Sequence, residues 1–134
     1  MALDPGILAF LNEPGRFATL ATINVDGAPQ QTVMWFMTDG ETVVMNTARG
    51  RVKDRNLLSD NRASICVEDG YRYVAIAGRV EMIEEQERAQ ADIKALAIRY
   101  SGAEEAERMM LDSFGRQERV TLLLSIDHVD AHGF

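Results

Sequence analysis

Apolar and polar residues alternate along several segments of the chain with the two-residue period of a β-strand. In segment 16–23, for example, Phe17, Thr19 and Ala21 fall on one side. The segments with this pattern are 16–23, 29–37, 41–46, 63–68, 73–83 and 120–129. Short glycine-containing turns, such as residues 25–28, join several of them, and such turns are typical of antiparallel hairpins.

Other segments repeat their apolar residues with a helical period. Residues 5–11 predict a short helix, which Asp4 can cap and in which Pro5 suits the first position. The other predicted helices are 51–58, 84–101 and 103–114. After the first helix the order is β-β-β-α-β-β-α-α-β, with mostly hairpin-length connections. This order predicts a mainly β, α+β fold: an antiparallel barrel with peripheral helices, in one domain over residues 1–134.

The composition is that of an ordinary globular protein. The chain has 134 residues, of which 46% are hydrophobic and 26% charged, so disorder is not expected. No apolar run is long enough to cross a bilayer, and the first residues lack the basic start of a secretory signal. We therefore expect a cytoplasmic protein. The single cysteine, Cys66, excludes an internal disulfide and a multi-cysteine zinc site, and we expect it to be a buried, inert thiol.

Positive charge is concentrated in one short stretch of an acidic protein. The whole chain has a net charge of −7, whereas residues 49–55 contain four cations and one carboxylate. A local positive site on an acidic chain suits a small anionic ligand better than a nucleic acid. The alternative is a solvated turn whose cations pair with Asp54 and Asp60.

A helical start at Arg51 would give these cations a particular role. Arg51 and Arg55 are four residues apart and share a helix face, with Lys53 at its flank. Positive charge is unfavourable at a helix N-terminus, so a bound anion would stabilise this arrangement. Asn46 and Thr47, at the end of the preceding strand, would add neutral donors.

Three consecutive large apolar residues, Met34, Trp35 and Phe36, make both faces of their strand apolar. One face must pack on the core, and the other needs a helix, a second subunit or a flat ligand to cover it. A purely structural role for the single tryptophan therefore stays open beside a role as a ligand-binding wall.

No catalytic acid, base or nucleophile is predicted, because the sequence contains no recognisable constellation of such groups. His128, Asp130 and His132 would share one strand face, but they lie at the chain end, and we expect no metal site there.

Several motifs resemble the pyridoxamine-phosphate-oxidase-like split-barrel flavoproteins. They are the FATLAT segment at 17–22, DGAPQ at 26–30, RVKDRNL at 51–57, DNRAS at 60–64 and GRV at 78–80. The similarity extends over nearly the whole chain and is closest to the small branch that uses the deazaflavin coenzyme F420. It implies a split β-barrel of the FMN-binding type.

The resemblance also implies a site and an assembly. Family members are homodimers with cofactors at the subunit interface, and the partner would contribute residues such as Tyr71 and Tyr73. The residues that would bind the cofactor are Val33, Met34 and Trp35 along the ring, Arg51 and Lys53 at the phosphate, Asn46 and Thr47 beside it, and Arg55 in the same basic cluster.

The function implied is an F420-dependent oxidoreductase. It would transfer a hydride between reduced F420 and a small conjugated acceptor such as a quinone, an enone or a tetrapyrrole-like compound. Formation of pyridoxal phosphate is not expected, because the C-terminal part has no evident equivalent of the residues that bind the substrate phosphate. An FMN-dependent enzyme of the same fold, or a non-catalytic module that binds a flavin or haem, remains as the alternative.

Overall fold

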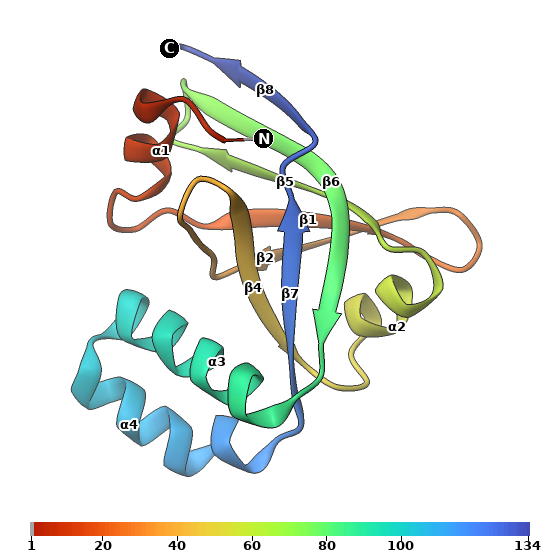
Figure 1. The fold of residues 1–134 in the computed structure, drawn as a ribbon, viewed down its shortest axis with the longest axis vertical. Helices are drawn as coiled ribbons and strands as arrows, with labels where there is room; N and C mark the ends of the chain where they lie inside the picture. The colour runs from red at the N-terminus through yellow and green to blue at the C-terminus, as the bar shows by residue number, and fades with distance from the viewer. Residues whose placement is uncertain (1) are drawn as a thin grey trace.

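Eight antiparallel strands form one strongly curled sheet in the computed structural model, which describes residues 2–134 (Figure 1). The strands are β1 (Ala18–Ile23), β2 (Pro29–Met34), β3 (Met37–Thr38), β4 (Thr42–Ala48), β5 (Arg62–Glu68), β6 (Tyr73–Ile83), β7 (Arg119–Ser125) and β8 (His128–His132). Their order is β2-β1-β5-β6-β7-β4-β3, and β8 pairs with β6 outside this path. The helices are α1 (Pro5–Leu11), α2 (Val52–Ser59), α3 (Gln86–Ser101) and α4 (Ala103–Asp112), followed by the short 3₁₀ helix η1 (Phe114–Arg116).

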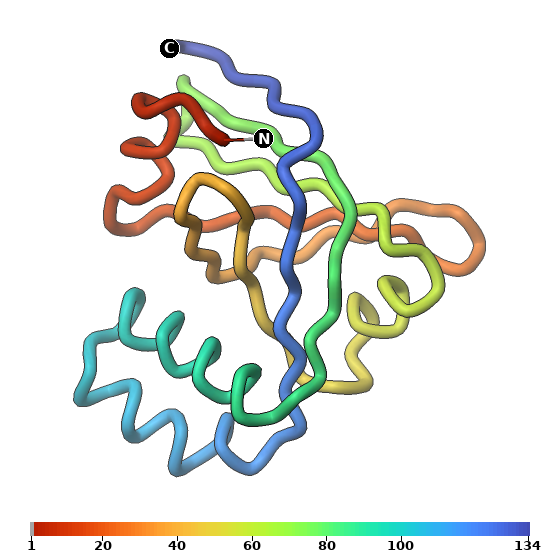
Figure 2. Tube along the Cα trace, in the orientation of Figure 1, coloured from red at the N-terminus to blue at the C-terminus, as the bar shows by residue number. Residues whose placement is uncertain are grey.

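Strand β6 joins the two halves of the curl. Its first part pairs with β5 as far as Arg79, and from Val80 onward it pairs with β7. Gly78 lies at the crossing point, where a Cβ atom would stand 1.9 Å from the carbonyl oxygen of Ser125. Only glycine allows this close approach of the two strands. The predicted α+β split barrel is therefore confirmed, and the trace in Figure 2 shows how β6 bends between the two halves.

The core fills the inside of the curl. Strand β1 alternates buried and partly buried residues, as its sequence pattern predicts. The largest fully buried side chains include Phe36, Leu20 and Leu122 from three different strands or connections, and Phe10 and Leu11 of α1 close one end. Helices α3 and α4 pack side by side below the sheet, where α3 contacts β4 and β7 (Figure 1).

Two predicted strands are interrupted in the structure. The strand predicted over 29–37 ends at Met34, and a new strand begins at Met37. Between them, the Phe36 amide donates to the Tyr100 hydroxyl and its carbonyl accepts from Arg99. These backbone groups bond to α3 instead of a neighbouring strand, which the local sequence pattern does not reveal.

The last predicted strand, 120–129, is two strands, β7 and β8. The chain bends after Ser125, and the Asp127 amide then donates to the carbonyl of Ala77. Strand β8 pairs with the first half of β6. Its His128 and His132 lie along this pairing, and no group of three or more His, Cys, Asp or Glu side chains in residues 2–134 is arranged to hold a metal ion. None of the helices in that range is both long and apolar enough to cross a membrane.

Candidate functional site

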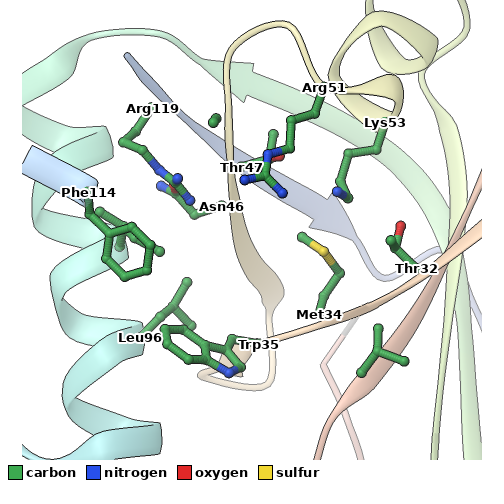
Figure 3. A pocket seen from close by; sticks show the side chains of 13 residues that line it. Thr32, Met34, Trp35, Asn46, Thr47, Arg51, Lys53, Leu96, Phe114 and Arg119 are labelled. Atoms are coloured by element: carbon green, nitrogen blue, oxygen red, sulfur yellow. The ribbon is translucent and has the colours of Figure 1, made fainter. Parts of the chain in front are cut away.

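A cavity of about 270 Å³ lies between the ends of β2 and β4, the start of α2, and the helices α3 and η1 (Figure 3). The residues of the predicted site that line it are Val33, Met34, Trp35, Asn46, Thr47, Arg51 and Lys53. Arg55, the remaining residue of that site, lies outside the cavity and is exposed on α2. Tyr71 and Tyr73 also lie outside the cavity of their own chain, where both rings contact His132.

The loop before α2 directs two cations into the cavity. Gly50 has a φ of 93°, a conformation that other residues rarely adopt, and its amide donates to the Asp54 carboxylate at 2.7 Å. This turn places Arg51 at the N-cap of α2 and Lys53 in its first turn. Arg51 is exposed at the rim, Lys53 is only 7% exposed, and both side chains point inward (Figure 3).

Asn46 and Thr47 lie near the end of β4, which continues to Ala48, and both pair with β7. The Asn46 amide nitrogen donates to the carbonyl of Ala89 and to the hydroxyl of Thr121, and its oxygen accepts from Arg119 Nε at 2.9 Å. Both donors and the acceptor of Asn46 thus have protein partners. Its contribution to the cavity is to hold Arg119 in place.

Three cations converge on the cavity without a carboxylate. Among residues 2–134, no ion pair involves Arg51, Lys53 or Arg119. Burial lowers the pKa of Lys53, and the charges of Arg51 and Arg119 lower it further. Burial, together with Arg51, lowers the pKa of Arg119 to about 10. Like charge therefore adds to the cost of keeping Lys53 and Arg119 protonated, and a bound anion would offset this cost.

Asp54 and Asp60 do form ion pairs, but their partners are not the cations that line the cavity. Asp54 pairs with Arg49, and Asp60 pairs with Arg62. Arg49 also contacts Glu84 and Glu118, so its guanidinium is enclosed by three carboxylates. The alternative of a self-paired basic turn therefore describes Arg49, whereas Arg51 and Lys53 keep their charges free for the cavity.

Trp35 forms the apolar wall of the cavity together with residues from the helices. Its ring stacks on Tyr100 with the centroids 5.3 Å apart and an interplanar angle of 7°, and it meets Phe114 edge to face at 6.2 Å. Helix α3 thus covers part of the second apolar face of this segment. Val33, by contrast, is 68% exposed at the outer edge strand β2.

Thr32 and Ala48, which adjoin predicted site residues, also line the cavity. Four further lining residues were not predicted from the sequence: Ile93, Leu96, Phe114 and Arg119. They reach it from the α3–α4–η1 segment and from the first residue of β7, far along the chain from the basic stretch. Of these four residues, Arg119 stands out in the sequence, because it is a cation next to the mostly apolar segment 120–124.

The curled antiparallel sheet and its flanking helices define a split β-barrel protein of the α+β class. Residues 3–133 match the family described as pyridoxamine 5'-phosphate oxidase, and the chain therefore belongs to that family.

Solved structures show the same fold. A conserved hypothetical protein from Mycobacterium tuberculosis is 30% identical, with a TM-score of 0.82 over 98% of this chain and 85% of that one. An F420 reductase is 27% identical, with a TM-score of 0.72 over 90% of this chain and 94% of the other. HutZ, a haem storage protein from Vibrio cholerae, is 21% identical with a TM-score of 0.73, over 100% of this chain and 97% of HutZ, and that likeness concerns the fold alone. Among curated proteins, none matches this sequence.

Proposed function

We propose that this protein is an F420-dependent oxidoreductase that reduces a small conjugated acceptor. The observation that carries the proposal is that two cations without a carboxylate partner in residues 2–134, Arg51 and Lys53, lie beside the apolar wall formed by Trp35. A phosphorylated cofactor with a flat ring matches this pairing of charge and apolar surface. The 27% identity with an F420 reductase, over nine-tenths of this chain, supports F420 over other cofactors of the same general shape.

The roles of the chain's own residues follow from their positions. Arg51 at the rim and Lys53 in the interior would bind the cofactor phosphate, while Met34, Trp35 and the open side of Val33 would contact its ring. When bound, reduced F420 supplies the hydride. The protein would orient the ring and exclude water, which agrees with a cavity that contains no carboxylate, histidine or cysteine able to act as acid, base or nucleophile.

The cavity is too small for a whole deazaflavin coenzyme. Its volume of about 270 Å³ lies below the roughly 300–1,000 Å³ of typical sites for drug-sized ligands. The edge strand β2 leaves Val33 exposed beside the cavity, and Phe17 on the neighbouring segment is 47% exposed. We propose that a second copy of the chain covers this edge and completes the site, so that the enzyme is a homodimer.

The test is a titration of the purified protein with F420 and, separately, with FMN, followed by Trp35 fluorescence. We expect F420 to quench Trp35 and to bind more tightly than FMN, and we expect reduced F420 to be oxidised in the presence of menadione or cyclohexenone. Tighter binding of FMN would identify a flavin enzyme instead. Binding without turnover of any acceptor would favour a storage or sensing module.

Variants of the two cations sharpen this test. Arg51→Ala and Lys53→Ala should each weaken F420 binding about ten- to a hundredfold, which corresponds to the roughly 1.5–3 kcal/mol of a hydrogen bond to a charged group. Arg116→Ala is the matched control, because Arg116 is exposed on η1 and does not line the cavity. Unchanged affinity in both cavity variants would contradict the proposed phosphate site.

A further inference from the structure

The third cation of the cavity, Arg119, is held by a different set of residues from Arg51 and Lys53. Its Nε donates to Asn46 Oδ1 at 2.9 Å, and its Nη1 donates to Gln117 Oε1 at 2.6 Å. Asn46 is fixed in turn by Ala89 and Thr121. The guanidinium is therefore held in one orientation before any ligand binds, and such preorganisation favours binding.

In the described part of the chain, Arg119 has an unpaired positive charge and a free hydrogen-bond donor. Both of its polar partners are neutral amides, and its Nη2 has no hydrogen-bond partner among residues 2–134. The residue is 5% exposed, so this cation is buried without a counter-charge. A buried cation that lacks a carboxylate partner is costly, and an anionic ligand at Nη2 would offset that cost.

The surroundings of Arg119 differ from those of the other two cations. Its guanidinium lies over the Phe114 ring at 5.0 Å, and Phe114 meets Trp35 edge to face. Leu96 of α3 lies on the same side of the cavity as Phe114 (Figure 3), and Ile93 of the same helix also lines the cavity. At the other end, Arg51 and Lys53 neighbour Thr32 and Met34 of β2 (Figure 3). Arg119 thus lies beside an aromatic ring and the aliphatic side chains of α3, whereas Arg51 and Lys53 lie nearer to β2.

We propose that Arg119 binds the carboxylate of the hydride acceptor, whose conjugated part lies on the wall of Phe114, Leu96 and Trp35. This inference rests on the proposed function and narrows it: an unsaturated carboxylic acid is the preferred acceptor, and a neutral quinone or enone of similar size is a weaker one. The free Nη2 of the planar guanidinium can donate to a carboxylate oxygen, and such a charge-assisted bond is stronger than one to a neutral acceptor. The phosphate of the cofactor would occupy the end with Arg51 and Lys53, which includes the exposed rim of the cavity.

The probe pair for this proposal is cinnamate and its neutral counterpart cinnamamide, which share the same conjugated skeleton. Each is titrated calorimetrically into the purified full-length protein, first without F420 and then with it. We expect cinnamate to bind at least tenfold more tightly than cinnamamide. Arg119→Gln should remove this difference, whereas Arg116→Gln, an equal change of charge three residues away, should preserve it.

A second variant separates recognition from folding. Arg119→Lys keeps the positive charge but loses the Nη2 donor and the bond to Asn46, so cinnamate should bind severalfold more weakly while the melting temperature stays close to that of the parent. Should Arg119→Gln fail to fold, Arg119→Lys and the cinnamate–cinnamamide difference in the parent protein still decide the question.

Three results would overturn the proposal: no binding of cinnamate with or without F420, equal affinity for cinnamate and cinnamamide, or a loss of F420 affinity in Arg119→Gln as large as that in Arg51→Ala. The last would assign Arg119 to the cofactor. Failure of the proposed function gives a different result from failure of this proposal. A protein that binds cinnamate through Arg119 but does not bind F420 would contradict the proposed function and leave the carboxylate site at Arg119 intact.

Discussion

Two cations separated by a single residue, Arg49 and Arg51, have opposite environments. Arg49 is enclosed by Asp54, Glu84 and Glu118, whereas no carboxylate pairs with Arg51 in the described part of the chain. The positive φ of Gly50 turns the backbone between them, so that one side chain joins the acidic residues and the other faces the cavity. Composition alone assigns both to one basic cluster, but the structure divides the cations into a paired set, represented by Arg49, and an unpaired set that faces the cavity, represented by Arg51.

The pKa values follow the same division. Burial of Arg49 acts to lower its pKa, but the hydrogen bond to Glu84 and the charges of Asp54 and Glu84 outweigh burial and raise it. Burial lowers the pKa of Lys53, and neighbouring cations add to this effect. The carboxylates around Arg49 stabilise the fold, whereas the unpaired cations of the cavity reduce the stability of the free protein, a cost that a bound anion would offset.

The largest effect is expected from breaking the paired set. Asp54 is fully buried and accepts hydrogen bonds from the Arg49 guanidinium and the Gly50 amide. Asp54→Ala removes both bonds and should lower the free energy of unfolding by about 3 kcal/mol, measured by urea denaturation. Asp60→Ala, which removes an exposed pair with Arg62, is the control and should have little effect. Equal effects of the two variants would contradict the division between the sets.

A substitution in the unpaired set should act in the opposite direction. Lys53→Met keeps a similar side-chain volume in a buried position and removes a charge that has no counter-ion. The free protein should gain about 1 kcal/mol of stability, while F420 affinity falls. Urea denaturation and F420 titration on the same preparation measure both quantities. A lower free energy of unfolding together with unchanged F420 affinity would show that Lys53 stabilises the fold and does not bind the cofactor.

The pH dependence of F420 affinity tests Lys53 by itself, and we expect a smaller, severalfold effect. Its pKa lies below the ordinary 10.5, so its charge is lost, and F420 affinity falls, as the pH rises through this lowered value. In the interval up to 10.5 the unfolded chain still binds this proton while the folded chain does not, so the stability of the free protein should rise with pH. Arg119 titrates nearby, with a pKa of about 10, so the comparison is made against Lys53→Met, in which the Lys53 contribution is absent.

The sequence predicted the parts of the site that are close together in the chain. The alternating pattern of β2, the polar pair Asn46 and Thr47, and the basic start of α2 all belong to short local segments with recognisable patterns. The part contributed by Phe114 and Arg119 could not be predicted, because it depends on how the α3–α4 pair folds back onto β4. The break after Met34 has the same cause: Tyr100 and Arg99 hold the backbone of Phe36 from 63 or more residues away.

The smallest effect is expected from Arg55, which tests whether the unpaired set extends beyond the residues that line the cavity. It lies in the same basic stretch, but its side chain is exposed on α2 and does not line the cavity. It can therefore act on a bound anion only through solvent, where the attraction is weak and is screened within a Debye length of about 10 Å at 0.1 M salt. Arg55→Ala should weaken F420 binding by no more than about twofold, and about 0.5 M salt should remove this difference. The tenfold or larger loss in Arg51→Ala should persist at that salt, because its contact with the anion is direct. A loss in Arg55→Ala as large as that in Arg51→Ala would show that the anion extends beyond the cavity along the exposed face of α2.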